Sequence, residues 1–129
     1  MVEIDGQEVP DTELIRTLGD KYNVEILSVT SEPRSAKELN EEFGIPIATG
    51  YRRIEDLTEV GLLSFEESVL TDERRRRDTY RRQIDHISVQ FSENSFTVSV
   101  EEHGEVENKL EAMWKSISET ERQSSSTGF

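Results

Sequence analysis

The sequence predicts a single α+β domain in which helices come first and strands follow. Two observations carry this prediction. Between residues 11 and 60, apolar side chains recur three or four positions apart, which is the spacing of one face of an α-helix. Between residues 63 and 100, apolar and polar residues alternate, as they do in half-buried β-strands. Only 33% of the 129 residues are hydrophobic, so we expect a modest core that dimerisation would supplement.

Residues 1–10 have no apolar period and contain Gly6 and Pro10, so we expect a flexible N-terminal arm. Asp11 follows at a position where its carboxylate could cap a helix, and Gly19 stands where that helix would end. The sequence therefore predicts a first helix between these two residues. Its apolar side consists of Leu14, Ile15 and Leu18.

Two further helices are bounded by residues typical of helix ends. A helix over about residues 20–31 is followed by Pro33, which cannot continue it. Ser35 is typical of an N-cap, and Glu38 completes a capping box, so a short helix begins there and ends at Gly44. The apolar faces of the two helices are Tyr22, Ile26 and Leu27, and Ala36, Leu39 and Phe43, respectively.

A longer helix is predicted from Pro46, a favourable first-turn residue, to Val60. Gly50 lies within it and costs about 1 kcal/mol of helix stability relative to alanine. We therefore expect the backbone of the helix that begins at Ser35 to approach closely at this glycine. The residues expected to face inward are Ile47, Gly50, Ile54 and Leu57. Those expected to face outward are Ala48, Thr49, Tyr51, Arg52 and Glu55.

The C-terminal half changes to the period of β-strands. A first hairpin begins at Leu63 and returns through Tyr80 towards Ile84, with the charged stretch TDERRRR at its tip. A second hairpin, whose strands are HISVQF and FTVSV, turns at SENS. A last amphipathic helix follows Gly104, and residues 121–129 have no apolar stripe, so we expect a disordered tail there. The stripe of the last helix consists of Val106, Leu110, Met113, Trp114 and Ile117.

A helix, a helix–turn–helix pair and a β-hairpin follow one another in the order of a winged helix-turn-helix domain. The segment from Ser35 to Leu63 resembles the recognition core of ArsR-like transcription regulators, particularly the small ones of halophilic archaea. The domain would span residues 11–83, and the second hairpin and last helix, residues 84–120, would form a packing or dimerisation extension. The matching positions are Ser35, Glu38-Leu39, Gly44-Ile45, the helix from Ile47 to Val60, and Gly61-Leu62.

This resemblance implies a sequence-specific DNA-binding regulator that acts as a homodimer. The helix over residues 46–60 would enter the major groove, and the arginine-rich hairpin, or wing, would contact the backbone or the minor groove. An arginine in the major groove can bind guanine bidentately, and a threonine methyl can contact a thymine methyl. The base-facing candidates are Ala48, Thr49, Tyr51 and Arg52. The other DNA-contacting candidates are Lys37, Arg53, Arg74, Arg75, Arg76, Arg77, Arg81 and Arg82.

Two apolar stripes, one near each end of the chain, are candidates for the dimer interface. We expect them to pair across a two-fold axis, so that each copy contributes the same surface. Trp114 could instead line a ligand pocket, but such a residue more often anchors packing or a dimer. The candidate dimerisation residues are Leu14, Ile15, Leu18, Leu110, Met113, Trp114 and Ile117.

Charge is distributed unevenly along the chain. There are 28 acidic and 15 basic residues, for a formal net charge of −13, and only four of the basic residues are lysines. Excess carboxylate with little lysine is typical of proteins from salt-loving archaea; the alternative is an ordinary acidic protein. The segment Arg74–Arg82, with six arginines and one aspartate, carries +5, which leaves −18 on the remainder. This asymmetry indicates a partner for the arginines.

Catalysis and metal binding find little support in the sequence. There is no cysteine, no nucleophile–base–acid set and no glycine-rich phosphate loop, so we expect neither an enzyme nor a cofactor. His86 and His103, with Asp85 and Glu107 nearby, are poorly spaced as ligands, and we expect no metal site. Without a membrane-length apolar run or a signal peptide, a cytoplasmic protein is expected. The alternative function is a winged-helix protein-interaction module or a DNA-mimicking acidic adaptor.

Overall fold

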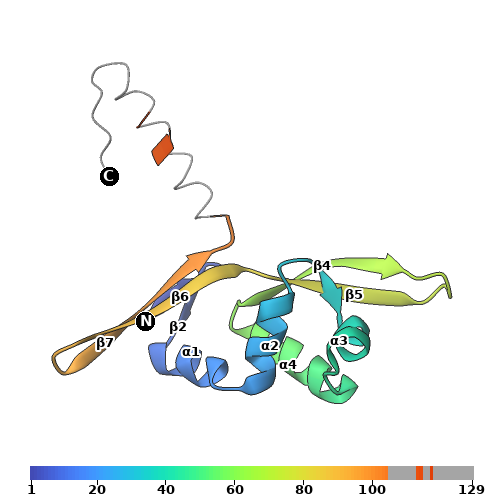
Figure 1. Ribbon diagram of the computed structural model, residues 1–129, viewed down its shortest axis with the longest axis horizontal. Helices are drawn as coiled ribbons and strands as arrows, with labels where there is room; N and C mark the ends of the chain where they lie inside the picture. The colour runs from blue at the N-terminus through green and yellow to red at the C-terminus, as the bar shows by residue number, and fades with distance from the viewer. Residues whose placement is uncertain (105–112, 115–116, 118–129) are drawn as a thin grey trace.

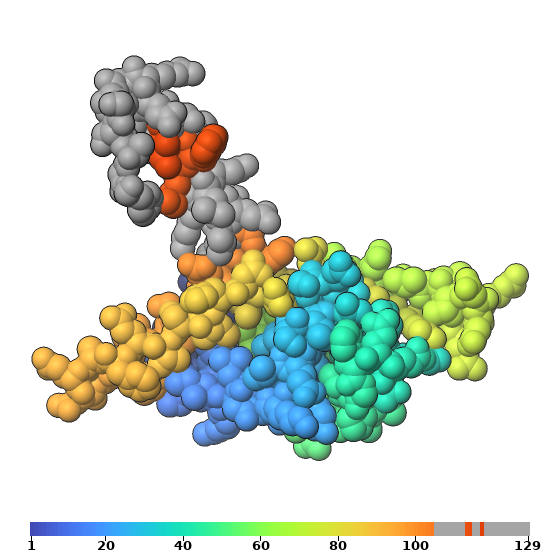
Figure 2. Space-filling view, in the orientation of Figure 1, coloured from blue at the N-terminus to red at the C-terminus, as the bar shows by residue number. Residues whose placement is uncertain are grey.

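The computed structural model describes residues 1–104, 113–114 and 117. Helices α1 to α4 pack together, and two long β-hairpins leave this helical body in opposite directions (Figures 1 and 2). The mixed α+β class predicted from the sequence is confirmed, and the arrangement is compatible with a winged helix-turn-helix domain. The predicted tail and most of the predicted last helix lie outside the described residues.

The first two helices, α1 (Asp11–Leu18) and α2 (Lys21–Val29), follow each other closely. Pro10, not Asp11, occupies the N-cap position of α1, and no side chain caps this helix, so the predicted cap is wrong. Asp11 lies in the first turn instead, where its carboxylate is 2.9 Å from the N-terminal amine. Asp20 caps α2 by accepting hydrogen bonds from the backbone N–H groups of Tyr22 and Asn23.

The helix–turn–helix consists of α3 (Ala36–Phe43) and α4 (Ile47–Glu59). The predicted capping box of Ser35 and Glu38 is present, and α3 ends at Gly44, whose φ of 70° favours glycine. The Asn40 side chain donates to the carbonyl of Ile45 at 2.9 Å, which fixes the short turn before α4 begins. Local sequence signals therefore set both ends of α3 and the direction in which α4 leaves.

Three details of this helix pair differ from the prediction. Ile47, expected to face inward, is 43% exposed at the start of α4. Gly50 is buried, but a Cβ built there would lie 3.8 Å from Cγ2 of Ile45, an ordinary van der Waals contact. No close backbone approach requires the glycine. Phe43 is 40% exposed, and the guanidinium of Arg34 lies 5.0 Å from its ring centroid.

The wing, defined here as residues 63–82, is the hairpin of β4 (Leu63–Leu70) and β5 (Arg76–Arg82). Strand β3 (Arg34–Ser35) pairs antiparallel with β5, so the sheet has the order β3-β5-β4. A bulge between Phe65 and Glu67 shifts the register of β4 against β5. The two-residue β3, which the sequence pattern did not predict, connects the wing to the beginning of α3.

Residues 84–102 form a second, separate hairpin of β6 (Ile84–Ser92) and β7 (Ser95–Glu102). In its cross-strand pairs, apolar residues lie opposite one another along one face of the hairpin. These pairs are Ile87 with Val100, Val89 with Val98, and Phe91 with Phe96.

The N-terminal residues form a hairpin of β1 (Val2–Ile4) and β2 (Gln7–Val9) instead of a flexible arm. Asp5 and Gly6 both have positive φ, as a tight hairpin turn requires. Val2, Ile4 and Val9 are buried in the same core as the helices, so the prediction of an arm was wrong.

The core joins all these segments at their bases. It includes residues of every helix, the N-terminal hairpin, the start of the wing and the root of the second hairpin. No helix in the described part of the chain is long and apolar enough to span a bilayer. The fully buried large side chains are Ile4, Val9, Leu14, Ile26, Thr30, Leu39, Ile45, Leu57, Leu62 and Leu63.

Candidate nucleic-acid interface

The outer face of α4 is set by the residues that the helix buries. Ile54 and Leu57 are 4% and 0% exposed, and they fix the rotation of the helix against the core. Tyr51 is then 61% exposed, and Arg52 beside it is also exposed. No residue of the described part of the chain forms an ion pair with Arg52. Of the other base-facing candidates, Ala48 is exposed and Thr49 is half-buried.

Arg53 lies on a different side of α4, turned towards α2. Its guanidinium is 2.9 Å from the carboxylate of Asp20 and 3.5 Å from that of Asp56. Lys37, on α3, is 3.7 Å from the carboxylate of Glu41 one turn away. Either cation would have to share or leave these carboxylates to contact a phosphate.

The wing tip carries a run of arginines without acidic partners. The tip turns through residues 71–75, where the backbone N–H groups of Arg74 and Arg75 donate to the carbonyl and the hydroxyl of Thr71. Arg74 has φ of 62°, a region uncommon for side chains other than glycine, asparagine or aspartate. Arg77 is half-buried and the other three are exposed. Within the described residues, none of the four residues 74–77 forms an ion pair.

Carboxylates elsewhere on the wing offset these arginines. Strand β4 brings Glu66 and Glu67 alongside β5, and the tip itself contains Asp72 and Glu73. With Asp78, the wing holds five carboxylates against six arginines. The strong positive charge of the segment 74–82 in sequence therefore becomes a nearly neutral hairpin in space, with its free cations at the tip.

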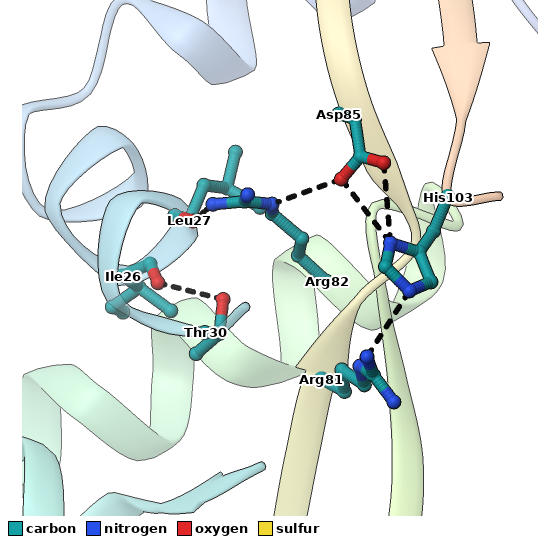
Figure 3. Close-up of polar contacts among 7 residues, drawn as sticks. All are labelled: Ile26, Leu27, Thr30, Arg81, Arg82, Asp85 and His103. Atoms are coloured by element: carbon teal, nitrogen blue, oxygen red, sulfur yellow. Dashed lines mark hydrogen bonds and ion pairs between the residues drawn. The ribbon is translucent and has the colours of Figure 1, made fainter. Parts of the chain in front are cut away.

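Arg81 and Arg82 lie at the foot of the wing, where the chain already supplies their partners (Figure 3). Arg82 donates to the carbonyl of Leu27 at 2.9 Å, and its Nε is 3.6 Å from Asp85. Arg81 lies 3.1 Å from Nε2 of His103. These contacts join the end of α2 to both hairpins, so the two arginines stabilise the junction between them.

His103 and Asp85 meet at this junction. Nδ1 of His103 is 3.2 Å from both carboxylate oxygens of Asp85, and Arg81 can only donate, so Nδ1–H donates to Asp85 and Nε2 accepts. Burial alone would raise the pKa of Asp85, but the hydrogen bond from His103 and the charge of Arg82 outweigh it and hold this pKa below its usual value. Within the described residues, no group of three or more such side chains could hold a metal ion.

A groove of about 620 Å³ separates the outer face of α4 from the wing. Tyr51 and Tyr80 line it from the two sides, together with Glu55 and Glu59. Burial, and then the negative charge of Asp78, raise the pKa of Tyr80 above its usual value. Tyr80 could not be selected from the sequence, because only the fold places it beside Tyr51.

The predicted dimerisation residues differ in how far the fold exposes them. Leu14 is fully buried in the core, so it cannot contact a second copy and this assignment was wrong. Ile15 is 39% exposed and Leu18 is half-buried. Leu110 lies outside the described residues, whereas Met113, Trp114 and Ile117 are helical and exposed.

Comparison with known proteins places this geometry in a class. Residues 18–64 match the family model of a helix-turn-helix domain. The match begins at the end of α1, includes α2, α3 and α4, and ends in the first residues of β4. A search of curated proteins found no match. The chain therefore contains a helix-turn-helix domain, which supports DNA binding, while most of the wing and all of the second hairpin lie beyond the matched residues.

Proposed function

We propose that this protein is a sequence-specific DNA-binding transcription regulator of the ArsR-like type that acts as a homodimer. The observation that carries the proposal is the exposed face of α4, where Tyr51 and Arg52 stand without acidic partners in the described chain. The same helix belongs to the matched helix-turn-helix segment. In such domains the second helix of the pair enters the major groove.

Each exposed group on α4 has a chemically defined role in this proposal. Arg52 donates bidentately to the O6 and N7 atoms of a guanine, the commonest specific contact in the major groove. Ala48 and the methyl of Thr49 contact thymine methyl groups, and the Tyr51 hydroxyl bonds to a base edge or a phosphate. Tyr80, across the groove, donates a hydrogen bond from its hydroxyl to the DNA backbone.

The wing tip supplies the sequence-independent part of binding. Arg74 to Arg77 contact phosphates or enter a narrow minor groove, where the negative potential attracts arginine. The strained backbone at Arg74 supports a role for this side chain, because glycine would relax the same turn. Lys37, Arg53, Arg81 and Arg82 are assigned weaker contributions, because each has a partner within the chain.

One observation favours a second candidate function. The wing holds nearly as many carboxylates as arginines, and Glu55 and Glu59 line the groove beside α4. A protein-interaction module, or an acidic adaptor that mimics DNA, would use these carboxylates to bind a basic protein. The free cations of the α4 face and wing tip favour DNA over this alternative, since a basic partner would be repelled by them.

The experiment that separates the two functions is sequencing of genomic fragments retained by the purified protein at low salt and at molar potassium chloride. DNA binding predicts enrichment of a motif with two-fold symmetry. The variant Arg52→Ala should lose the preference for one base in each half-site. Retention without any motif, by both the unmodified protein and the variant, would refute sequence-specific recognition.

A further inference from the structure

The hairpin of β6 and β7 leaves an apolar stripe open to water. It extends from the helical body on the side opposite the wing (Figure 2). Phe91 is 80% exposed, Val89 41% and Phe96 36%, and the two phenylalanine rings pack against each other with centroids 6.3 Å apart. The rest of the stripe is covered, since Ile84 and Val98 belong to the core and Ile87 and Val100 pack against it.

A two-stranded hairpin with an exposed apolar face is expected to be unstable on its own in water. Two strands alone are marginally stable in water, and independent stability requires a third strand or packing against another surface. Within the described residues, β6 and β7 form a sheet of two strands. The outer part of the stripe, which consists of Val89, Phe91 and Phe96, therefore needs a cover.

The charge pattern indicates what that cover is. Residues 87–100 contain a single charged side chain, Glu93 in the turn, within a chain of which 33% is charged. The opposite face carries only serine, threonine and glutamine between residues 88 and 99. Two copies of a chain with net charge −13 repel each other across most of their surfaces, but not across this segment. Natural proteins usually place charged side chains on strands that must not associate with another chain. The strands of this hairpin carry none along the stripe.

We propose that the apolar stripe of the β6–β7 hairpin packs face to face against the same stripe of a second copy. The contact is self-complementary, as a two-fold interface requires, and two sheets pack about 10 Å apart when their side chains interdigitate. Phe91 and Phe96 lie at its centre. The proposal names the interface of the homodimer in the proposed function. It rests on that function only for the biological role of the dimer, which is to bind DNA.

The interface extends beyond the hairpin. A stable interface buries roughly 800 Å² per partner, whereas a covered aromatic side chain contributes about 150 to 250 Å². Further apolar surface continues from the stripe at its root, where a groove of about 280 Å³ lies between α2 and β6. Val24, 47% exposed, and Leu18 line this groove, and Ile15 is exposed on α1. One of the residues predicted for dimerisation, Leu18, thus extends the same surface.

The test compares two substitutions on one strand, with molar mass measured by light scattering and sedimentation equilibrium in the absence of DNA. Phe91→Lys places a charge in the stripe, and Gln90→Lys places the same charge on the opposite face. We expect a dimer for the unmodified chain and for Gln90→Lys, and a dimer dissociation constant raised about 100-fold or more for Phe91→Lys. The dimer should tighten from low to molar potassium chloride, because salt screens the repulsion of the acidic surfaces.

Two results would overturn the proposal. The first is an unmodified chain that is monomeric at molar salt, and the second is a Phe91→Lys variant that remains a dimer. In the second case, dissociation by Trp114→Glu would assign the interface to the C-terminal stripe. Circular dichroism and the milder Phe91→Ser variant distinguish loss of the dimer from unfolding of the monomer. Unfolding is not expected, since a side chain that is 80% exposed in the monomer contributes little to its core.

The same measurement is independent of DNA binding. A chain that dimerises through the hairpin but retains no DNA would refute the proposed function and leave this interface intact. A chain that binds an operator half-site as a monomer at every salt concentration would refute the interface and leave DNA binding intact.

Discussion

Neighbouring arginines have different surroundings in this fold. Arg52 is exposed on α4 without an acidic partner in the described residues, whereas Arg53, one position later, contacts two carboxylates. The difference follows from the helix period, since consecutive residues are about 100° apart around the axis. At the scale of the residue, the proposed base recognition therefore rests on Arg52, whereas Arg53 is held by contacts within the chain.

Substitution of this pair tests the assignment. Arg52→Ala should cost about 1 to 3 kcal/mol of binding free energy on the cognate site and relax the preference at one base pair. Arg53→Ala should leave the base preference unchanged and lower the free energy of unfolding by at most about 1 kcal/mol, because its ion pairs are partly exposed. Titrations against the cognate site and single-base variants measure the first effect. Equal, sequence-independent losses for both variants would remove the distinction.

Asp85 gives a prediction for pH. Its pKa is lower in the folded state, so its stabilising contribution is present above the unfolded value of about 3.9 and is lost as pH falls through the lower folded value. Asp85→Asn should therefore reduce the free energy of unfolding at pH 7, and the difference from the unmodified chain should shrink below pH 4. Urea denaturation at several pH values measures it, with the exposed Asp72→Asn as control. A difference that stays constant into strong acid would contradict the role of this carboxylate.

At the scale of the element, α4 contains a glycine that its packing does not require. A Cβ at position 50 would meet only Cγ2 of Ile45, at 3.8 Å. Gly50→Ala should therefore raise the free energy of unfolding by about 0.5 to 1 kcal/mol, because alanine favours the helix and restricts the unfolded chain. Gly61→Ala is the opposite control: its φ is 86°, and a Cβ there would lie 3.1 Å from the carbonyl oxygen of Ile4. Destabilisation by Gly50→Ala would show a tighter helix contact than the geometry indicates.

The elements that the sequence predicted well are those with local signals. Both ends of α3 follow from Ser35, Glu38 and Gly44, whose effects depend on residues within one turn. By contrast, β3 exists only because β5 pairs with it, and β5 is separated from it by two helices. The Asp5-Gly6 turn was a local signal for the N-terminal hairpin, although the close packing of Ile4 against the distant Gly61 was not.

The candidate site was predictable to a similar extent. The helix period alone indicated that Tyr51 and Arg52 face outward. It could not show that Arg53 pairs with Asp20 or that Arg81 contacts His103, because these partners are distant in sequence. The charge of the wing was also misjudged from the arginine run, since the opposing strand supplies its carboxylates.

At the scale of the whole molecule, binding of DNA by a chain with net charge −13 should respond weakly to salt. Each neutralised phosphate releases a counterion, which alone gives a steep loss of affinity with salt. Repulsion between DNA and the remaining carboxylates acts in the opposite direction and is screened within about 3 Å at molar salt. We predict a salt slope much flatter than the arginine count implies, measured by fluorescence anisotropy from low to molar potassium chloride. A steep fall in affinity would contradict the halophilic interpretation of this surface and leave DNA binding standing.

The central claim, that α4 lies in the major groove with Arg52 at a guanine, is tested most directly by methylation interference on a selected operator. Methylation of guanine N7 blocks the atom to which arginine would donate in the major groove. The account predicts that binding of the unmodified protein is blocked by methylation at one guanine in each half-site. The Arg52→Ala variant should bind more weakly and lose sensitivity at that guanine alone. Sensitivity at no guanine, or an identical pattern for protein and variant, would contradict the claim.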